Sequence, residues 1–146
     1  MSTIPDIDHT IIIAAPIETV WETLTTPEEI TRWWGAIGFR PEVGHTFHLQ
    51  TTPQGEWDGK TYADITEITP PHRLGFTWYV PGVPVTHVSF TLRSVEEGTE
   101  VRLIHTGWND LPFDATPIRD GLDQGWGSCV LVNLRDAVVG GIVREE

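Results

Sequence analysis

The chain has 146 residues, a formal net charge of −12 and a single lysine. A protein that binds nucleic acid or an anionic membrane surface needs basic side chains for the phosphates, so this composition argues against both as partners. The length suits one domain with a substantial core, and we expect a single domain over residues 1–146.

The sequence also predicts a cytoplasmic protein. It contains one cysteine, Cys129, which excludes an internal disulfide and fits a reducing compartment. No window approaches the roughly 20 apolar residues of a membrane span. The N-terminus lacks the basic and apolar regions of a signal peptide. Because Cys129 falls on the apolar side of a helical pattern described below, we expect it to be a small buried side chain.

The first part of the chain predicts one strand and two short helices. Alternating apolar residues indicate a strand over residues 7–13. Pro16 then begins a helix with one apolar face. Thr26 and Glu29 have the spacing of a capping box, in which Thr26 caps the second helix and Glu29 bonds back to it. This second helix is expected to end at Gly35.

From residue 40 to residue 106 the apolar period changes to two, which is typical of strands. One strand is expected around Phe47, and another over residues 57–68, with an irregularity at Asp58-Gly59. Three further strands follow over residues 74–80, 88–92 and 101–105. The turns between them are short, so the sequence predicts an antiparallel meander.

The longest helix is predicted over residues 114–144. Its apolar stripe recurs at steps of three and four and consists of Ile118, Leu122, Trp126, Cys129, Val130, Leu134, Ala137 and Val138. Asp114 or Thr116 can cap its start, Gly140-Gly141 suits its end, and Arg144 places a cation there. The alternative is a shorter helix that begins near Trp126 after a loop.

Three glycines, Gly121, Gly125 and Gly127, lie inside this helical pattern. Each costs about 1 kcal/mol relative to alanine in a helix interior, so some other interaction must compensate. One interpretation is a close approach of the helix to a sheet. The other is space left open beside the helix.

Together these elements predict an α+β fold in which a curved antiparallel sheet covers its apolar face with the C-terminal helix. Only this helix is long enough for that role. A curved sheet does not close perfectly along a whole helix, so we expect a gap near one end.

Several segments in this order resemble the START-like, or SRPBCC, superfamily of helix-grip proteins. More narrowly, they are similar to the family homologous to the C-terminal domain of the activator of heat-shock protein 90 ATPase. The matching segments are Ile13-Ala14-Ala15-Pro16, Thr31-Arg32-Trp33-Trp34, Pro70-Pro71-His72-Arg73-Leu74, His105-Thr106-Gly107 and Gly125-Trp126. The resemblance implies the helix-grip fold, but this superfamily hosts many activities.

Seven tryptophans are the unusual feature of the composition. If the sheet curves around the last helix, many aromatic side chains converge near one end and can line an apolar ligand pocket. The expected ligand-binding residues are Trp33, Trp34, Phe39, Phe47, Trp57, Trp78, Phe90, Leu103, His105, Trp108, Trp126 and Val130. The alternative is a core rich in tryptophan.

His105 shares a face with apolar residues that should meet the helix. It could orient a ligand or transfer a proton. Alternatively, it is a core histidine paired with a backbone carbonyl or a Thr or Ser hydroxyl. Glu67 has the parity of an inward residue and could pair with His105, unless a bulge turns it outward. Metal binding is not expected, because His45 and His48 point to opposite faces of a strand.

The sequence therefore predicts a binding protein for a small apolar molecule, with no cofactor. The alternative function is an enzyme of cyclase or hydrolase type that uses His105 and Glu67. A chaperone partner is disfavoured, since so acidic a chain gains no electrostatic steering toward an acidic chaperone. Exposed tryptophans could also form a homodimer interface.

Overall fold

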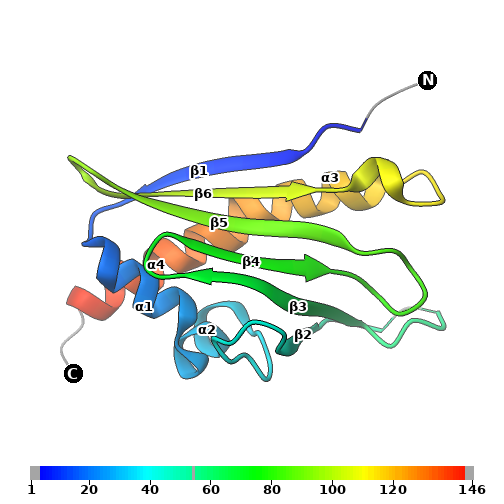
Figure 1. Cartoon of the computed structure of the whole chain (residues 1–146), viewed down its shortest axis with the longest axis horizontal. Coiled ribbons are helices and arrows are strands. Elements are labelled where there is room, and N and C mark those ends of the chain that lie inside the picture. The colour runs from blue at the N-terminus through cyan, green and yellow to red at the C-terminus, as the bar shows by residue number, and fades with distance from the viewer. Residues whose placement is uncertain (1–3, 54, 144–146) are drawn as a thin grey trace.

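The computed structural model describes residues 4–53 and 55–143, and it confirms the α+β helix-grip architecture (Figure 1). The strands are β1 (Ile7–Ile13), β2 (Thr46–Gln50), β3 (Lys60–Thr69), β4 (Arg73–Trp78), β5 (Thr86–Val95) and β6 (Gly98–Thr106). The helices are α1 (Ile17–Thr25), α2 (Pro27–Trp34), the 3-10 turn η1 (Trp108–Asp110), α3 (Thr116–Gly125), the π-helical segment η2 (Trp126–Val130) and α4 (Leu131–Val143).

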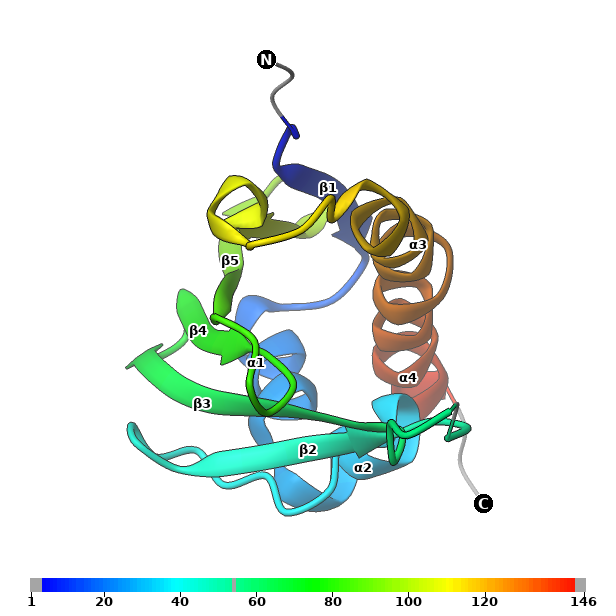
Figure 2. The same ribbon diagram turned by 90° about the vertical axis from the view of Figure 1, so that its right-hand side faces the viewer.

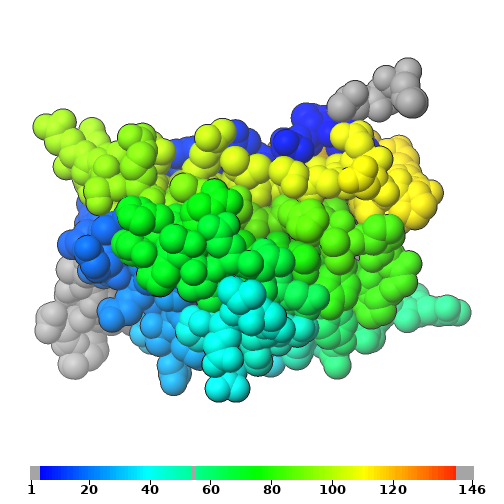
Figure 3. Space-filling model, in the orientation of Figure 1, coloured from blue at the N-terminus to red at the C-terminus, as the bar shows by residue number. Residues whose placement is uncertain are grey.

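The six strands form one antiparallel sheet in the order β1-β6-β5-β4-β3-β2, which confirms the predicted meander. Strand β1 forms one edge of the sheet and pairs with β6, where Ile7 lies opposite His105. Figure 2 shows the sheet curving around one side of the molecule while α3 and α4 run along the other. Figure 3 looks onto the outer face, which β3 to β6 form.

Alternation along the strands sends one set of side chains into the core, as the period of two requires. In β5, Val88, Phe90 and Leu92 are buried, and in β6 the buried residues include Val101 and Leu103. The α1–α2 hairpin covers the C-terminal end of the long helix (Figure 1). The core therefore occupies the end of the molecule where α1, α2 and α4 meet the sheet.

The long C-terminal helix is confirmed, and it begins at Thr116. The N-cap position is Ala115, which makes no side-chain cap bond, so neither predicted cap residue occupies it. The Asp114 carboxylate, one residue earlier, accepts the backbone N–H of Thr116 at 3.0 Å. The helix runs through Gly140-Gly141 to Val143, within the predicted bounds of residues 114–144. Arg144 lies outside the described residues.

The two halves of this helix pack very differently. In α4, Leu131, Leu134 and Val138 are buried against the core. In α3, no residue is buried, although Ile118 and Leu122 continue the apolar stripe. The N-terminal half therefore stands away from the sheet, which explains how a gap arises at that end.

The π-helical segment η2 separates the two halves and changes their phase. In η2 the backbone N–H of Leu131 bonds to the carbonyl of Trp126, five residues back. Because this wider turn shifts the helical register, Leu131 enters the core and Cys129 faces solvent. The prediction of a buried Cys129 is therefore wrong, since it assumed an unbroken α-helix.

Of the three helix glycines, one permits a close approach to the sheet and two lie beside open space. A Cβ added at Gly127 would lie 2.7 Å from the His9 ring on β1, so this glycine permits a close approach. A Cβ added at Gly121 or Gly125 would meet nothing within 4 Å, so these two face open space.

Two local predictions also need correction. Thr26 makes no side-chain cap bond, and its backbone N–H already donates to the Glu22 carbonyl, so the predicted capping box does not form. Glu29 pairs instead with Arg32. The strand predicted from residue 57 begins at Lys60. Trp57 lies before it, and its indole N–H bonds to the carbonyl of Lys60 at 3.1 Å.

The glycine geometry predicts opposite effects of two alanine substitutions. Gly121→Ala should raise the free energy of unfolding by up to about 1 kcal/mol through helix propensity. Gly127→Ala should lower it by about 1 to 3 kcal/mol, because the His9 ring must move. Urea unfolding of both variants measures this difference. A stabilising Gly127→Ala would contradict the close packing of η2 on β1.

Candidate functional site

A pocket of about 690 Å³ lies where α3 stands away from the sheet. Figure 2 looks into this end of the molecule. Its walls come from α3 with η2, the β2–β3 hairpin, the β4–β5 turn and the loop around η1. The predicted gap near one end of the helix therefore corresponds to an open pocket.

The structure places half of the predicted ligand-binding residues in this wall. They are Trp34, Trp57, Trp78, Trp108, Trp126 and Val130. The other half line no part of it and are buried in the core: Trp33, Phe39, Phe47, Phe90, Leu103 and His105. The sequence predicted that the aromatic residues converge near one end of the helix but could not locate the boundary between core and pocket there.

Several wall residues were missed by the sequence analysis. Those from the helix and its preceding loop are Leu111, Phe113, Ile118, Leu122 and Gly125, and the strands and turns add Leu49, Thr51, Thr61, Tyr79, Val80, Val83 and Thr86. A signal for the helical ones was present: Ile118, Leu122, Trp126 and Val130 recur every four residues. The turn residues carried no periodic signal.

Three tryptophans from different elements meet at the inner end of the pocket. The rings of Trp34 and Trp78 are nearly parallel, with 7° between their planes and 6.1 Å between their centroids. Trp126 lies against both, at 5.6 Å from Trp34 and 5.1 Å from Trp78. This cluster separates the solid core from the pocket.

His105 supports the cluster from within the core. The Trp126 indole N–H donates to His105 Nδ1 at 3.1 Å, so this nitrogen carries no proton. Nε2 therefore holds the ring proton and donates to the Thr86 hydroxyl at 2.7 Å. That hydroxyl donates in turn to the Trp78 carbonyl at 2.9 Å. The core interpretation of His105 holds, with a threonine and an indole as partners.

The surroundings keep His105 neutral. Burial lowers the pKa of His105 from 6.5 to about 3, and repulsion from His87 adds to the effect. The side chain has no exposed surface, and both ring nitrogens bond to protein groups. His105 therefore positions Trp126 and Thr86, and it does not reach the pocket itself.

Glu67 lies outside the core, as the bulge alternative required. A register shift in β3 between Ile65 and Glu67 turns it to the outer face. There its carboxylate accepts hydrogen bonds from Arg73 and Thr69 at 3.0 Å each, and these bonds lower its pKa. The pairing of Glu67 with His105 that the sequence left open is therefore contradicted.

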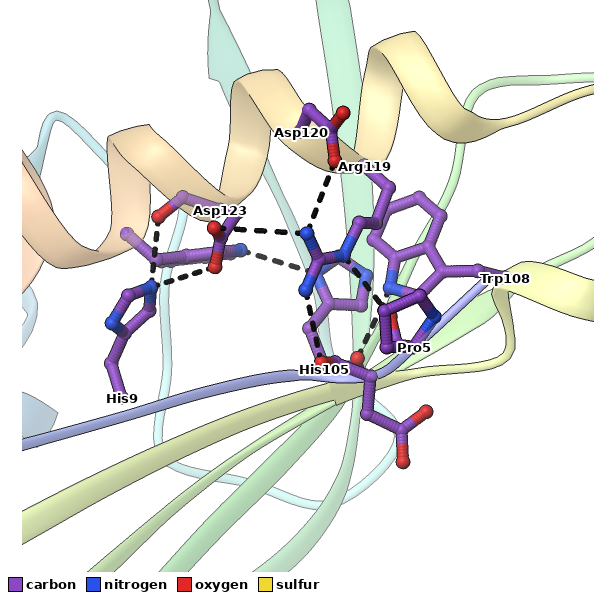
Figure 4. A network of polar contacts seen from close by, with 9 residues as sticks. Pro5, His9, His105, Trp108, Arg119, Asp120 and Asp123 are labelled. Atoms are coloured by element: carbon purple, nitrogen blue, oxygen red, sulfur yellow. Dashed lines mark hydrogen bonds and ion pairs between the residues drawn. The ribbon is translucent and has the colours of Figure 1, made fainter. Parts of the chain in front are cut away.

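A polar clasp holds α3 beside β1, as Figure 4 shows. His9 Nε2 lies 2.8 Å from the Asp123 carboxylate and 2.9 Å from the Asp123 carbonyl. Arg119 donates to the carbonyls of Pro5 and Asp6 at 3.0 and 3.1 Å. Because α3 has no fully buried residue and Leu122 packs only in part against the core, these bonds help to fix the outer wall of the pocket.

The curved sheet, the long helix and the pocket between them define a helix-grip protein of the START-like class. The chain belongs to the family of activator of Hsp90 ATPase homolog 1-like proteins, whose pattern matches residues 14–138. This agrees with the family resemblance found in the sequence. No curated protein matches the chain.

Solved structures share the fold over nearly the whole chain. BH1534 from Bacillus halodurans is 31% identical, with a TM-score of 0.76, over 94% of this chain and 99% of that one. MLL2253 from Mesorhizobium loti is 24% identical, with a TM-score of 0.78, over 93% and 98%. The Aha1 dimer from Colwellia psychrerythraea is 24% identical, with a TM-score of 0.72, over 92% and 96%. The last two likenesses concern the fold alone.

Two further properties bear on the function. Among the described residues, no helix combines the length and apolar character needed to cross a bilayer. In the same part of the chain, no three His, Cys, Asp or Glu side chains gather as a metal site.

The neutral His105 predicts a defined response to pH. Its folded pKa lies below its unfolded value of 6.5, so its stabilising contribution is complete above pH 6.5 and is lost as pH falls toward 3. The slope should approach about 1.4 kcal/mol per pH unit for this one proton. Urea unfolding between pH 6.5 and 4.5 should show this loss, reduced in His105→Gln.

Nitrogen-15 NMR of the folded protein provides a test that needs no variant. The His105 ring should remain the neutral tautomer with its proton on Nε2 from pH 8 to pH 5. A titration of this ring near pH 6.5 would disprove the buried network.

Proposed function

We propose that this chain binds a small, largely apolar molecule in the pocket between the sheet and the N-terminal half of the long helix. The observation that supports this most directly is the pocket itself. Its volume of about 690 Å³ lies within the range of small-molecule sites. Its wall is mainly aromatic and aliphatic, with a few hydroxyl groups.

The fold leaves apolar surface of α3 uncovered beside this pocket. Packing α3 onto the sheet would bury Ile118, which is 51% exposed, and would gain roughly 25 cal/mol for each Å² removed from water. Instead, the clasp of His9, Asp123 and Arg119 ties α3 to β1 at the edge of the sheet, and no residue of α3 is buried. Gly125 leaves further space beside the helix. An apolar ligand would supply the contacts that the helix does not make.

The enzyme hypothesis receives no support from the two residues on which it rested. A general acid or base must reach its substrate within hydrogen-bonding distance. His105 is sealed in the core and Glu67 lies on the opposite face of the sheet. The family description names a chaperone activator. For this chain we take from the family the fold and not that activity.

The homodimer stays a prediction. Phe113 and Ile118 are 44% and 51% exposed beside the pocket, so a second copy could cover apolar surface there. The Colwellia psychrerythraea relative is described as a dimer. Sedimentation velocity of the full chain should show whether a species of twice the monomer mass forms, and a monomer at all concentrations would contradict the prediction.

The ligand proposal predicts that the neutral fluorescent probe N-phenyl-1-naphthylamine binds with one saturable site. Transfer of the probe from water to an apolar pocket should raise its fluorescence and shift its emission to shorter wavelength. Titration of the full chain measures both changes. No saturable response to this probe would count against the proposal.

Two leucine substitutions in α3 provide a matched comparison. Gly125 lines the pocket, so Gly125→Leu should place a side chain in the open space and weaken probe binding at least about tenfold. Gly121 lies one turn earlier, outside the pocket wall, and Gly121→Leu should leave the affinity unchanged. Equal affinities of the two variants would place the probe elsewhere.

A further inference from the structure

The pocket wall contains no charged side chain. None of the described residues that line it is Asp, Glu, Lys, Arg or His. An ionised ligand group would therefore lose its hydration without gaining an opposite charge, which is strongly unfavourable. The net charge of −12 acts further against an anion. The ligand that fits this wall is uncharged.

Most hydroxyl protons in the wall are already committed to protein acceptors. Thr86 donates to the Trp78 carbonyl at 2.9 Å, and Thr51 donates to the Gly59 carbonyl at 3.2 Å. Tyr79 donates to the Asp64 carboxylate at 3.2 Å. Only the Thr61 hydroxyl has no described hydrogen bond, and it can either donate or accept.

The indole N–H groups of the wall divide into two sets. Three of them bond to the protein: Trp57 donates to the Lys60 carbonyl, while Trp108 and Trp126 donate to His105. The N–H groups of Trp34 and Trp78 donate to none of the described residues. Among the described residues, every buried side-chain nitrogen has a hydrogen-bond partner. The indole nitrogens of Trp34 and Trp78 have none, so they are not fully buried.

The two tryptophans that carry these open donors both line the pocket. The rings of Trp34 and Trp78 are nearly parallel, and both line the wall. Trp34 is packed against Trp33, Phe47 and Trp126 on its other sides. An indole N–H can only donate, so a ligand must bring acceptors to match it.

We propose, resting on the ligand-binding function above, that the pocket selects an uncharged aromatic carbonyl compound, such as a polycyclic ketone or quinone. Its rings would pack among the tryptophans, and its carbonyl oxygen would accept a hydrogen bond from Trp34 or Trp78. A hydrocarbon of the same shape would desolvate these donors without a partner, which should weaken binding by about tenfold or more.

The pair 9-fluorenone and fluorene tests this preference on the unmodified chain, since the two molecules differ only by a carbonyl in place of a methylene. Equilibrium dialysis should show that fluorenone binds about tenfold more tightly. The anion 9-fluorenone-2-carboxylate should bind more weakly than fluorenone at pH 7. Equal affinities for fluorenone and fluorene, or tightest binding of the anion, would overturn the inference while leaving the proposed function intact.

Substitutions then identify the donors. Trp34→Phe and Trp78→Phe keep an aromatic ring but remove the N–H, so at least one should reduce the ratio of fluorenone to fluorene affinity. Trp21→Phe removes an indole N–H outside the pocket and should change neither affinity. An undiminished ratio in both pocket variants would refute the assignment. Failure of both compounds to bind would refute the inference and the proposed function together.

Discussion

The hydrogen bond from the Trp126 indole to His105 fixes the point at which the long helix meets the sheet. On one side of this point, α4 packs Leu134 and Val138 into a solid core. On the other side, α3 departs from the sheet and the pocket begins. Because His105 is neutral and both its nitrogens are paired, the bond is made in a dry interior where an unpaired partner would be costly. The inner wall of the pocket therefore rests on a core residue.

The backbone of the long helix allows close packing at one position and open space at another. The π-helical segment η2 begins at this same tryptophan, and π-turns often occur at functional sites. Gly127 lets η2 approach β1, whereas Gly125 leaves the pocket side open. The His9 imidazole then bonds to the Asp123 carbonyl just before the wider turn. One helix thus packs tightly at its C-terminal half and forms a wall at its N-terminal half.

Much of the fold could be predicted because periodicity and turn residues are local signals. The strand over Ile7–Ile13 and the order of the elements follow from these signals. The error at Cys129 and the alternatives left open at Glu67 arose where the backbone period changes. Cys129 faces solvent because the π-turn changes the helical phase, and Glu67 turns outward because a bulge changes the strand phase. A single added residue in either element is invisible to a pattern that assumes constant period.

The amino-acid sequence by itself determined the inward face of most strands and that one terminal helix must cover a curved sheet. It also showed the load of tryptophan and the helix glycines that mark an unusual site. Only the tertiary structure decided which inward residues form core and which face the pocket. Phe90 and Trp78 lie on the same face of the sheet, yet Phe90 is buried in the core and Trp78 lines the pocket. The physical reason is that burial depends on the distance between helix and sheet at each position, and no local pattern encodes that distance.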